Sequence, residues 1–195
     1  MKKRNWLMFS LFFGMAAFYL SSCNSNSTNN AEPTANPKDS AQQHNEAKFD
    51  KAGEQDAKAV VDAYSASLFE MSVSDSVKAY SMNDDVKSLA SAMSEAHARI
   101  NSDIRQLASK KTISLPAELS ADQLDKIKSL KAKKDMDKEY VKDLVSDHKD
   151  AIALFQKSAD NCTDTDIKSW FSNALPELRK HLDMAMTEED KMKKK

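Results

Sequence analysis

Three histidines stand at positions in this sequence where an aliphatic side chain would be expected. His97, His148 and His181 each continue an apolar stripe with the three-and-four spacing of a buried helix face. Imidazole binds divalent transition metals, forms hydrogen bonds and exchanges protons near neutral pH. The sequence therefore predicts three helices that each place one imidazole in a protein core, and the chemistry depends on whether these imidazoles meet.

A fourth polar side chain belongs with these candidates. Glu70 falls beside the apolar arc of a helix expected over residues 54–81, among alanines and valines that allow a neighbouring helix to pack closely. Its carboxylate is therefore either partly buried or at the edge of the arc, where it reaches water. Glu70 and His97 lie at nearly equal distances along the chain from the turn at Asn83, so antiparallel pairing puts them at one level of a bundle.

Three imidazoles and one carboxylate near one level are a sufficient ligand set for zinc, iron, manganese or copper. The candidate metal ligands are Glu70, His97, His148 and His181. None of these histidines has a glutamate three residues before it, so the Glu-x-x-His pairs of di-iron bundles are missing. This disfavours a ferritin-type di-iron oxidase.

Two other interpretations of the four side chains stay open. They could hydrogen-bond one another as a metal-free polar core that sets the helix register, or they could act in acid–base chemistry. No complete catalytic set accompanies them, and no glycine follows Gly53, which excludes phosphate loops and other glycine-dependent sites. We therefore expect a binding or structural role rather than an enzyme, and we assign no catalytic residue.

The helices that must position these side chains form a recognisable pattern. Besides residues 54–81, helices are expected from Asp84, over 135–160 and over 164–189. About 24 residues separate the second from the third, and the capping-box pattern Ser120-Ala121-Asp122-Gln123 opens a short helix within them. Such a crossover distinguishes ferritin-like bundles from simple up-down bundles. The sequence predicts an all-α, ferritin-like four-helix bundle with a long crossover that contains a short helix.

The N-terminus has the organisation of a bacterial lipoprotein signal. Three basic residues precede an apolar run over residues 6–20, and small residues lead to Cys23. We expect residues 1–22 to be a signal peptide, 23–52 to be the lipidated Cys23 and a flexible tether rich in Asn, Ser, Thr and Pro, and 53–195 to be the bundle. The protein is then lipid-anchored in the bacterial cell envelope. Asn24 is not the aspartate linked to inner-membrane retention, so the outer membrane is expected.

Charge and cysteine content limit the partners of the chain. The formal net charge of −1 offers no basic surface for nucleic acid, apart from the lysine-rich C-terminal end. The expected partner is the membrane, through the lipid; the sequence identifies no protein partner. With Cys23 lipidated, Cys162 has no partner in the chain, so both a free thiol and a disulfide between two copies stay open.

Six short segments between Ala57 and Met186 form a known combination: Leu68-Phe69-Glu70-Met71, Glu95-Ala96-His97, Leu115-Pro116, Met136-Asp137-x-x-Tyr140, Asp147-His148 and Leu175-Pro176-x-Leu178-x-x-His181-Leu182. They resemble the bacterial domain of unknown function 4142. Members of that family are exported, many are assigned to the outer membrane, and they are regarded as ferritin-like bundles without an established molecular function. The resemblance implies that the family's recurrent polar positions are Glu70, His97, His148 and His181.

The chain departs from the family pattern at two places. The family commonly has Asp-His where this chain has Ala96-His97, and Phe-Asp where it has Met136-Asp137. The absence of an acid beside His97 leaves open what orients its ring. The sequence supports two functions: an envelope lipoprotein whose bundle binds a divalent metal, or a non-catalytic envelope interaction or stress-related module whose cluster is only a polar core.

Overall fold

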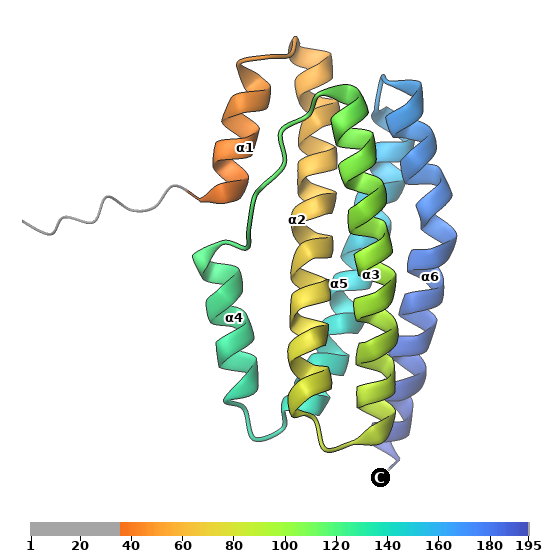
Figure 1. Ribbon diagram of the computed structural model, residues 1–195. Coiled ribbons are helices and arrows are strands. Elements are labelled where there is room, and N and C mark those ends of the chain that lie inside the picture. The colour runs from red at the N-terminus through yellow and green to blue at the C-terminus, as the bar shows by residue number, and fades with distance from the viewer. Residues whose placement is uncertain (1–35, 195) are drawn as a thin grey trace, which may run out of the picture. The chain divides into compact units, whose positions relative to one another are not determined.

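The computed structural model describes residues 36–194, and the secondary structure of this part of the chain is entirely helical (Figure 1). Its helices are α1 Pro37–Glu46, α2 Lys51–Tyr80, α3 Asp84–Lys111, α4 Ala121–Lys131, α5 Met136–Asn161 and α6 Thr165–Lys193. The four long ones, α2, α3, α5 and α6, form a bundle, which confirms the predicted fold class. Within the described residues, none of the helices has the length and apolar character needed to cross a membrane.

The four long helices form two antiparallel hairpins that lie side by side. α2 packs against α3, and α5 packs against α6 (Figure 1). The chain leaves α3 at the upper end in Figure 1 and returns along the outer side of α2 through α4, so that α5 starts again at the lower end. α3 and α5 are therefore parallel. This long crossover with a short helix is the ferritin-like arrangement that the sequence predicts.

Two of the predicted helix starts are confirmed by capping contacts, whereas α2 begins at Lys51, three residues before its expected start. The Asn83 side chain accepts a hydrogen bond from the Asp85 backbone N–H at the start of α3. Ser120 and Gln123 form a reciprocal capping box at the start of α4. Gln123 Nε2 also donates to the carbonyl oxygen of Ser65 at 3.2 Å, which joins the crossover helix to α2.

The domain begins earlier than expected. α1 packs against α2, and its residue Asn45 is only 2% exposed. Asn45 forms two hydrogen bonds with the backbone of Ser114. Asn45 Nδ2 donates to the Ser114 carbonyl oxygen at 3.0 Å, and the Ser114 N–H donates to Asn45 Oδ1 at 2.8 Å. The expectation that residues 23–52 form only a tether is therefore wrong from Pro37 onward, because Asn45 and Ala41, one turn apart, bury one side of a mostly polar segment. The predicted signal peptide, Cys23 and residues up to 35 lie outside the described residues.

The hydrophobic core has two parts. One includes Ile104, Phe155 and Phe171, and the other includes Met93 and Leu144. On each of α3, α5 and α6, the histidine of the apolar stripe lies between residues of the two parts. The histidines therefore form a polar layer across the middle of an otherwise apolar bundle.

A buried aspartate connects the two hairpins at their upper end. Asp56 on α2 is 4% exposed and accepts hydrogen bonds from the backbone N–H groups of Thr163 at 3.0 Å and Asp164 at 2.7 Å, and from the Thr163 hydroxyl at 2.9 Å. These contacts hold the turn between α5 and α6 against α2. They therefore determine how far along α2 the second hairpin lies, and with it the level of its histidines.

Candidate metal centre

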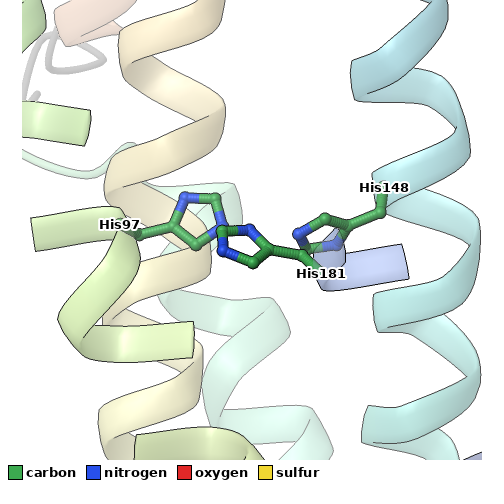
Figure 2. A group of neighbouring side chains, drawn as sticks. All are labelled: His97, His148 and His181. Atoms are coloured by element: carbon green, nitrogen blue, oxygen red, sulfur yellow. The ribbon is translucent and has the colours of Figure 1, made fainter. Parts of the chain in front are cut away.

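The three stripe histidines meet in the middle of the bundle (Figure 2). Their rings come from α3, α5 and α6, and the ring centroids are 5.5 Å apart for His97–His148 and His148–His181 and 5.6 Å apart for His97–His181. One ring nitrogen of each lies within 4.8 Å of those of the other two. All three residues are at most 4% exposed. The predicted convergence is confirmed, and their role as metal ligands stays a prediction.

The histidines share one level because they lie at similar distances from the lower end of the bundle. At that end α3 starts at Asp84, α5 starts at Met136 and α6 ends at Lys193. The number of residues between each of these helix ends and the histidine of the same helix is nearly equal in the three helices. At a rise of roughly 1.5 Å per residue, these separations agree to within about 1.5 Å along the bundle. Constant helical rise therefore brings together side chains that are far apart in the sequence.

The outer nitrogens of two of the rings have well-placed partners. His148 Nδ1 lies 2.9 Å from the Leu144 carbonyl oxygen, which can only accept, so Nδ1 carries the proton and donates. His97 Nδ1 lies 2.9 Å from Ser67 Oγ on α2. The Ser67 hydroxyl can donate to the His97 carbonyl oxygen at 3.5 Å, in which case His97 Nδ1 also donates. Both rings then have their lone pair on Nε2.

The third ring has an acidic partner on its outer side. His181 Nε2 faces Glu177 Oε1, one turn earlier on α6, at 3.8 Å. A proton on Nε2 is favoured by this carboxylate and leaves the lone pair on Nδ1. The outer nitrogens of His97 and His148 are thus hydrogen-bonded, and that of His181 faces a carboxylate beyond hydrogen-bond distance.

The inner nitrogens of the same rings are buried and unsatisfied. Among the described residues, no hydrogen-bond partner reaches His97 Nε2, His148 Nε2 or His181 Nδ1. A buried polar atom without a partner costs about 1–3 kcal/mol, and native folds rarely leave several of them together. Three such atoms around one point therefore indicate that something binds between them.

Burial keeps the three imidazoles neutral at pH 7. It lowers the pKa of His148 and of His181 to about 4. The pKa of His97 lies well below its ordinary value, first because of burial and then because of its two histidine neighbours. Neutral imidazole is the form that binds metals, so binding at pH 7 does not have to displace protons from the rings.

Glu70 is buried but stands apart from the histidine group. Its side chain is 7% exposed, and burial, followed by the charge of Asp147, raises the pKa of its carboxyl well above its ordinary value. Asp147, the residue before His148, is the carboxyl group whose proximity contributes most to this shift after burial. Glu70 is not in the set of ligand atoms that lie within 4.8 Å of one another. The structure thus brings together three of the four predicted ligands and pairs the fourth with Asp147.

The offset of Glu70 has a geometric reason. Counted along the helices, Glu70 lies closer to Tyr80, the last residue of α2, than His97 lies to Asp84, the first residue of α3. The difference is about three residues, or about 4.5 Å, which is nearly one helical turn. The prediction from sequence measured both distances from Asn83, so it counted the turn residues 81–83 as part of the helix that carries Glu70. It therefore missed this difference. The residue of α2 at the level of the histidines is Ser67.

Sequence reasoning missed two residues of this region. Ser67 orients the His97 ring in a chain that lacks the acid commonly found beside that histidine, and a serine in a segment rich in small residues carries no sequence signal for such a role. Asp147 did have a signal, since it directly precedes His148 and is part of the family-like segment. Its pairing with Glu70 depends on the contact between α2 and α5.

The nitrogen-only donor set fits some metal ions better than others. Three neutral imidazoles suit zinc, copper or ferrous iron, whereas manganese prefers oxygen ligands, which this set lacks without Glu70. Nitrogens that bind one ion at the usual distance lie roughly 3.3 Å apart. The three inner nitrogens, which lie within 4.8 Å of one another, would have to approach by roughly 1.5 Å at most. Small side-chain rotations provide such a movement.

These observations describe an all-α bundle with a long crossover and a buried cluster of three histidines in its core. The profile of a family defined by a domain of unknown function, DUF4142, matches residues 38–187, so the chain belongs to this family. The match includes almost all of α1, in agreement with a domain that starts near Pro37. Neither the curated proteins nor the solved structures provide a match.

Proposed function

We propose that the three histidines bind one divalent transition metal ion, namely zinc, copper or ferrous iron, in a protein that a lipid on Cys23 holds in the bacterial cell envelope. The observation that supports the metal most is the division within each ring. Within residues 36–194, the outer nitrogens of His97 and His148 have hydrogen-bond partners and that of His181 faces a carboxylate, whereas the inner nitrogens have no partner. Outer partners that orient ligand rings are usual around metal ions in proteins.

A water molecule satisfies this arrangement less well than a metal ion does. With protons on the outer nitrogens, His97, His148 and His181 all present acceptors to the centre. A water molecule has two hydrogens and can donate to only two of them. A metal ion accepts a lone pair from each of the three rings, so it leaves no inner nitrogen unsatisfied.

The position of the cluster supports binding rather than turnover. The rings are at most 4% exposed and lie between two apolar parts of the core. A lipoprotein with such a centre would hold a metal ion in the envelope, and the N-terminal signal pattern supports that location. The competing function is an envelope interaction or stress-related module in which the same histidines are only a polar core.

Metal analysis of the full-length chain, purified in detergent, tests the proposal. We expect close to one zinc, copper or iron ion per chain after loading and removal of free metal. Loss of an outer partner of a ligand lowers metal affinity by about 10–100-fold, so loss of a ligand should lower it at least as much. His97→Ala, His148→Ala and His181→Ala should each show this loss.

A fourth histidine provides the matched control. His44 lies on α1 and is exposed, so His44→Ala removes an imidazole without touching the cluster and should retain full binding. Circular dichroism of each variant identifies any that fails to fold, and the corresponding glutamine variant replaces it. Substoichiometric metal in the wild-type chain under all loading conditions would favour the polar core instead.

A further inference from the structure

An acidic cavity lies next to the histidine centre. This cavity, of about 540 Å³, is between α2, α4 and α5, and the exposed side chains of Asp122, Asp125 and Asp143 line it. A second cavity, of about 400 Å³, reaches His97 and His148. Four residues line both cavities, and these are Phe69, Glu70, Lys126 and Asp147. The two cavities therefore adjoin at the Glu70–Asp147 pair.

Glu70 is the buried member of that pair. It is 7% exposed, whereas Asp147 is exposed to solvent and directly precedes His148. In the part of the chain that the structure describes, no hydrogen-bond donor reaches Glu70 Oε2. A buried carboxylate oxygen is costly unless a proton or a cation binds it. A proton meets this need in the metal-free chain, and a cation bound between Glu70 and Asp147, where the two cavities meet, would meet it in the proton's place.

The charges around the outer cavity favour cations over anions. Besides Glu70, four aspartates line it, against the two lysines Lys126 and Lys133. A cleft lined by an excess of one charge raises the local concentration of the opposite charge and its rate of association by 10–10³. A divalent ion would therefore collect in this cavity, and from it the way to His97 and His148 passes Glu70 and Asp147.

We propose that Glu70 and Asp147 form a cation-binding position on the access route to the histidine centre, which holds a divalent metal ion before it passes to the histidines. This inference rests on the proposed function of the histidines as metal ligands. Carboxylate oxygens bind zinc, copper and cobalt more weakly than a set of three imidazoles does, so the transfer is favourable. In this role Glu70 affects the rate at which the metal ion reaches the histidines, but it is not a ligand of the ion once the histidines have bound it.

The rate of Co²⁺ uptake by the full-length chain, followed by the visible absorption of the bound ion in a stopped-flow instrument, tests this role. We expect Glu70→Gln and Asp147→Asn to load on the order of tenfold more slowly than the wild type. The final stoichiometry and the final spectrum should be unchanged. Asp183→Asn is the matched control, since Asp183 is an exposed acid on α6 that lines neither cavity, and it should load at the wild-type rate.

A variant with the opposite expected effect sharpens the test. Lys126 lines both cavities and opposes an approaching cation. Lys126→Gln should therefore load faster than the wild type, by several-fold, with the same final spectrum. Loading rates that are equal in all four variants and the wild type would overturn the access route. An altered final spectrum in Glu70→Gln would overturn it as well, because Glu70 would then be a ligand of the loaded site.

Manganese can detect binding at Glu70 and Asp147 separately from binding at the histidines, because Mn²⁺ prefers oxygen ligands. In a His181→Gln chain we expect electron paramagnetic resonance to show weakly bound Mn²⁺ that is lost when Glu70→Gln is added. No difference between these two chains would refute the binding position. A wild-type chain that takes up no Co²⁺ would refute both the histidine site and the route to it, whereas normal uptake at unchanged rates would refute the route alone.

Discussion

The two nitrogens of each cluster histidine differ in their contacts, and the residues responsible lie on several helices. Ser67 on α2 and the Leu144 carbonyl on α5 hold the rings of His97 and His148 through neutral groups. Neutral partners do not stabilise an imidazolium as a carboxylate does, so burial keeps these rings unprotonated. In this chain Ser67, rather than an acid beside His97, contacts the outer nitrogen of that ring.

Acidification should destabilise the metal-free protein between about pH 6.5 and pH 4. Unfolded histidines bind protons below about 6.5, whereas burial lowers the pKa of His148 and His181 in the folded chain to about 4. In this window the unfolded state binds more protons, so the free energy of unfolding decreases as the pH falls, by up to about 3 kcal/mol for each histidine. Urea unfolding of the chelator-treated chain across the window measures the decrease.

Glu70 contributes to the pH dependence with the opposite sign. Its raised pKa means that the folded state retains a proton that the unfolded state releases above about 4.3. Glu70→Gln should therefore make the loss of stability on acidification steeper, while His44→Ala, at an exposed position, should leave it unchanged. The burial argument would be refuted if Glu70→Gln showed the same unfolding free energy at both ends of the window.

At the scale of helices, α1 and α4 are the two that lie outside the four-helix core, and side-chain contacts of single residues join both to it. Gln123 attaches α4 to Ser65, and Asn45 attaches α1 to the segment after α3. α1 has few apolar residues to bury, and its composition resembles that of a linker. Polar contacts, rather than hydrophobic periodicity, distinguish it from a tether. These are the two hydrogen bonds to Ser114 and the contacts of Gln42 and Lys38 with Asp62 on α2.

Asn45→Ala should release α1 locally while the bundle stays folded. The change removes both hydrogen bonds to the half-buried Ser114 backbone, at a cost of at most about 1–3 kcal/mol. We expect faster hydrogen exchange in residues 37–46 and 112–116 and unchanged exchange in the core of α2, α3, α5 and α6. Gln43→Ala, at an exposed position of the same helix, is the control, and unchanged exchange of α1 in Asn45→Ala would contradict the role of this contact.

At the scale of the whole molecule, the start of the domain at Pro37 lies close along the chain to Cys23, the proposed site of lipid attachment. The chain from Cys23 to Pro37 is short, and even a fully extended chain covers at most about 3.6 Å per residue. A lipid on Cys23 would therefore hold the bundle within about 50 Å of the membrane surface. This is a shorter reach than a tether up to residue 52 would allow.

Lipid attachment can be tested with the two cysteines of the chain. Expressed in a bacterial host with radiolabelled palmitate, the wild-type chain and Cys162→Ser should incorporate label and appear in the membrane fraction. Cys23→Ser should incorporate none, because the predicted lipid is attached to that thiol. Equal labelling of Cys23→Ser and the wild type would refute the lipoprotein proposal.

Cys162 is a poor candidate for a bond to a second copy of the chain. It is 7% exposed, and burial together with the charge of Asp56 raises the pKa of its thiol to about 12, so little of the reactive thiolate forms at pH 7. The disulfide dimer stays a prediction, and it would require the turn after α5 to open. The buried thiol packs with the upper part of the core.

The sequence by itself determined the four long helices, the short crossover helix and the apolar side that each histidine occupies. Stripe spacing and helical rise depend only on the order of residues within one helix, which is why His97, His148 and His181 meet as predicted. Only the tertiary structure decided that Ser67 rather than Glu70 lies at that level and that Glu70 pairs with Asp147. Those partners depend on where each turn ends and how neighbouring helices are rotated, and no local pattern contains that information.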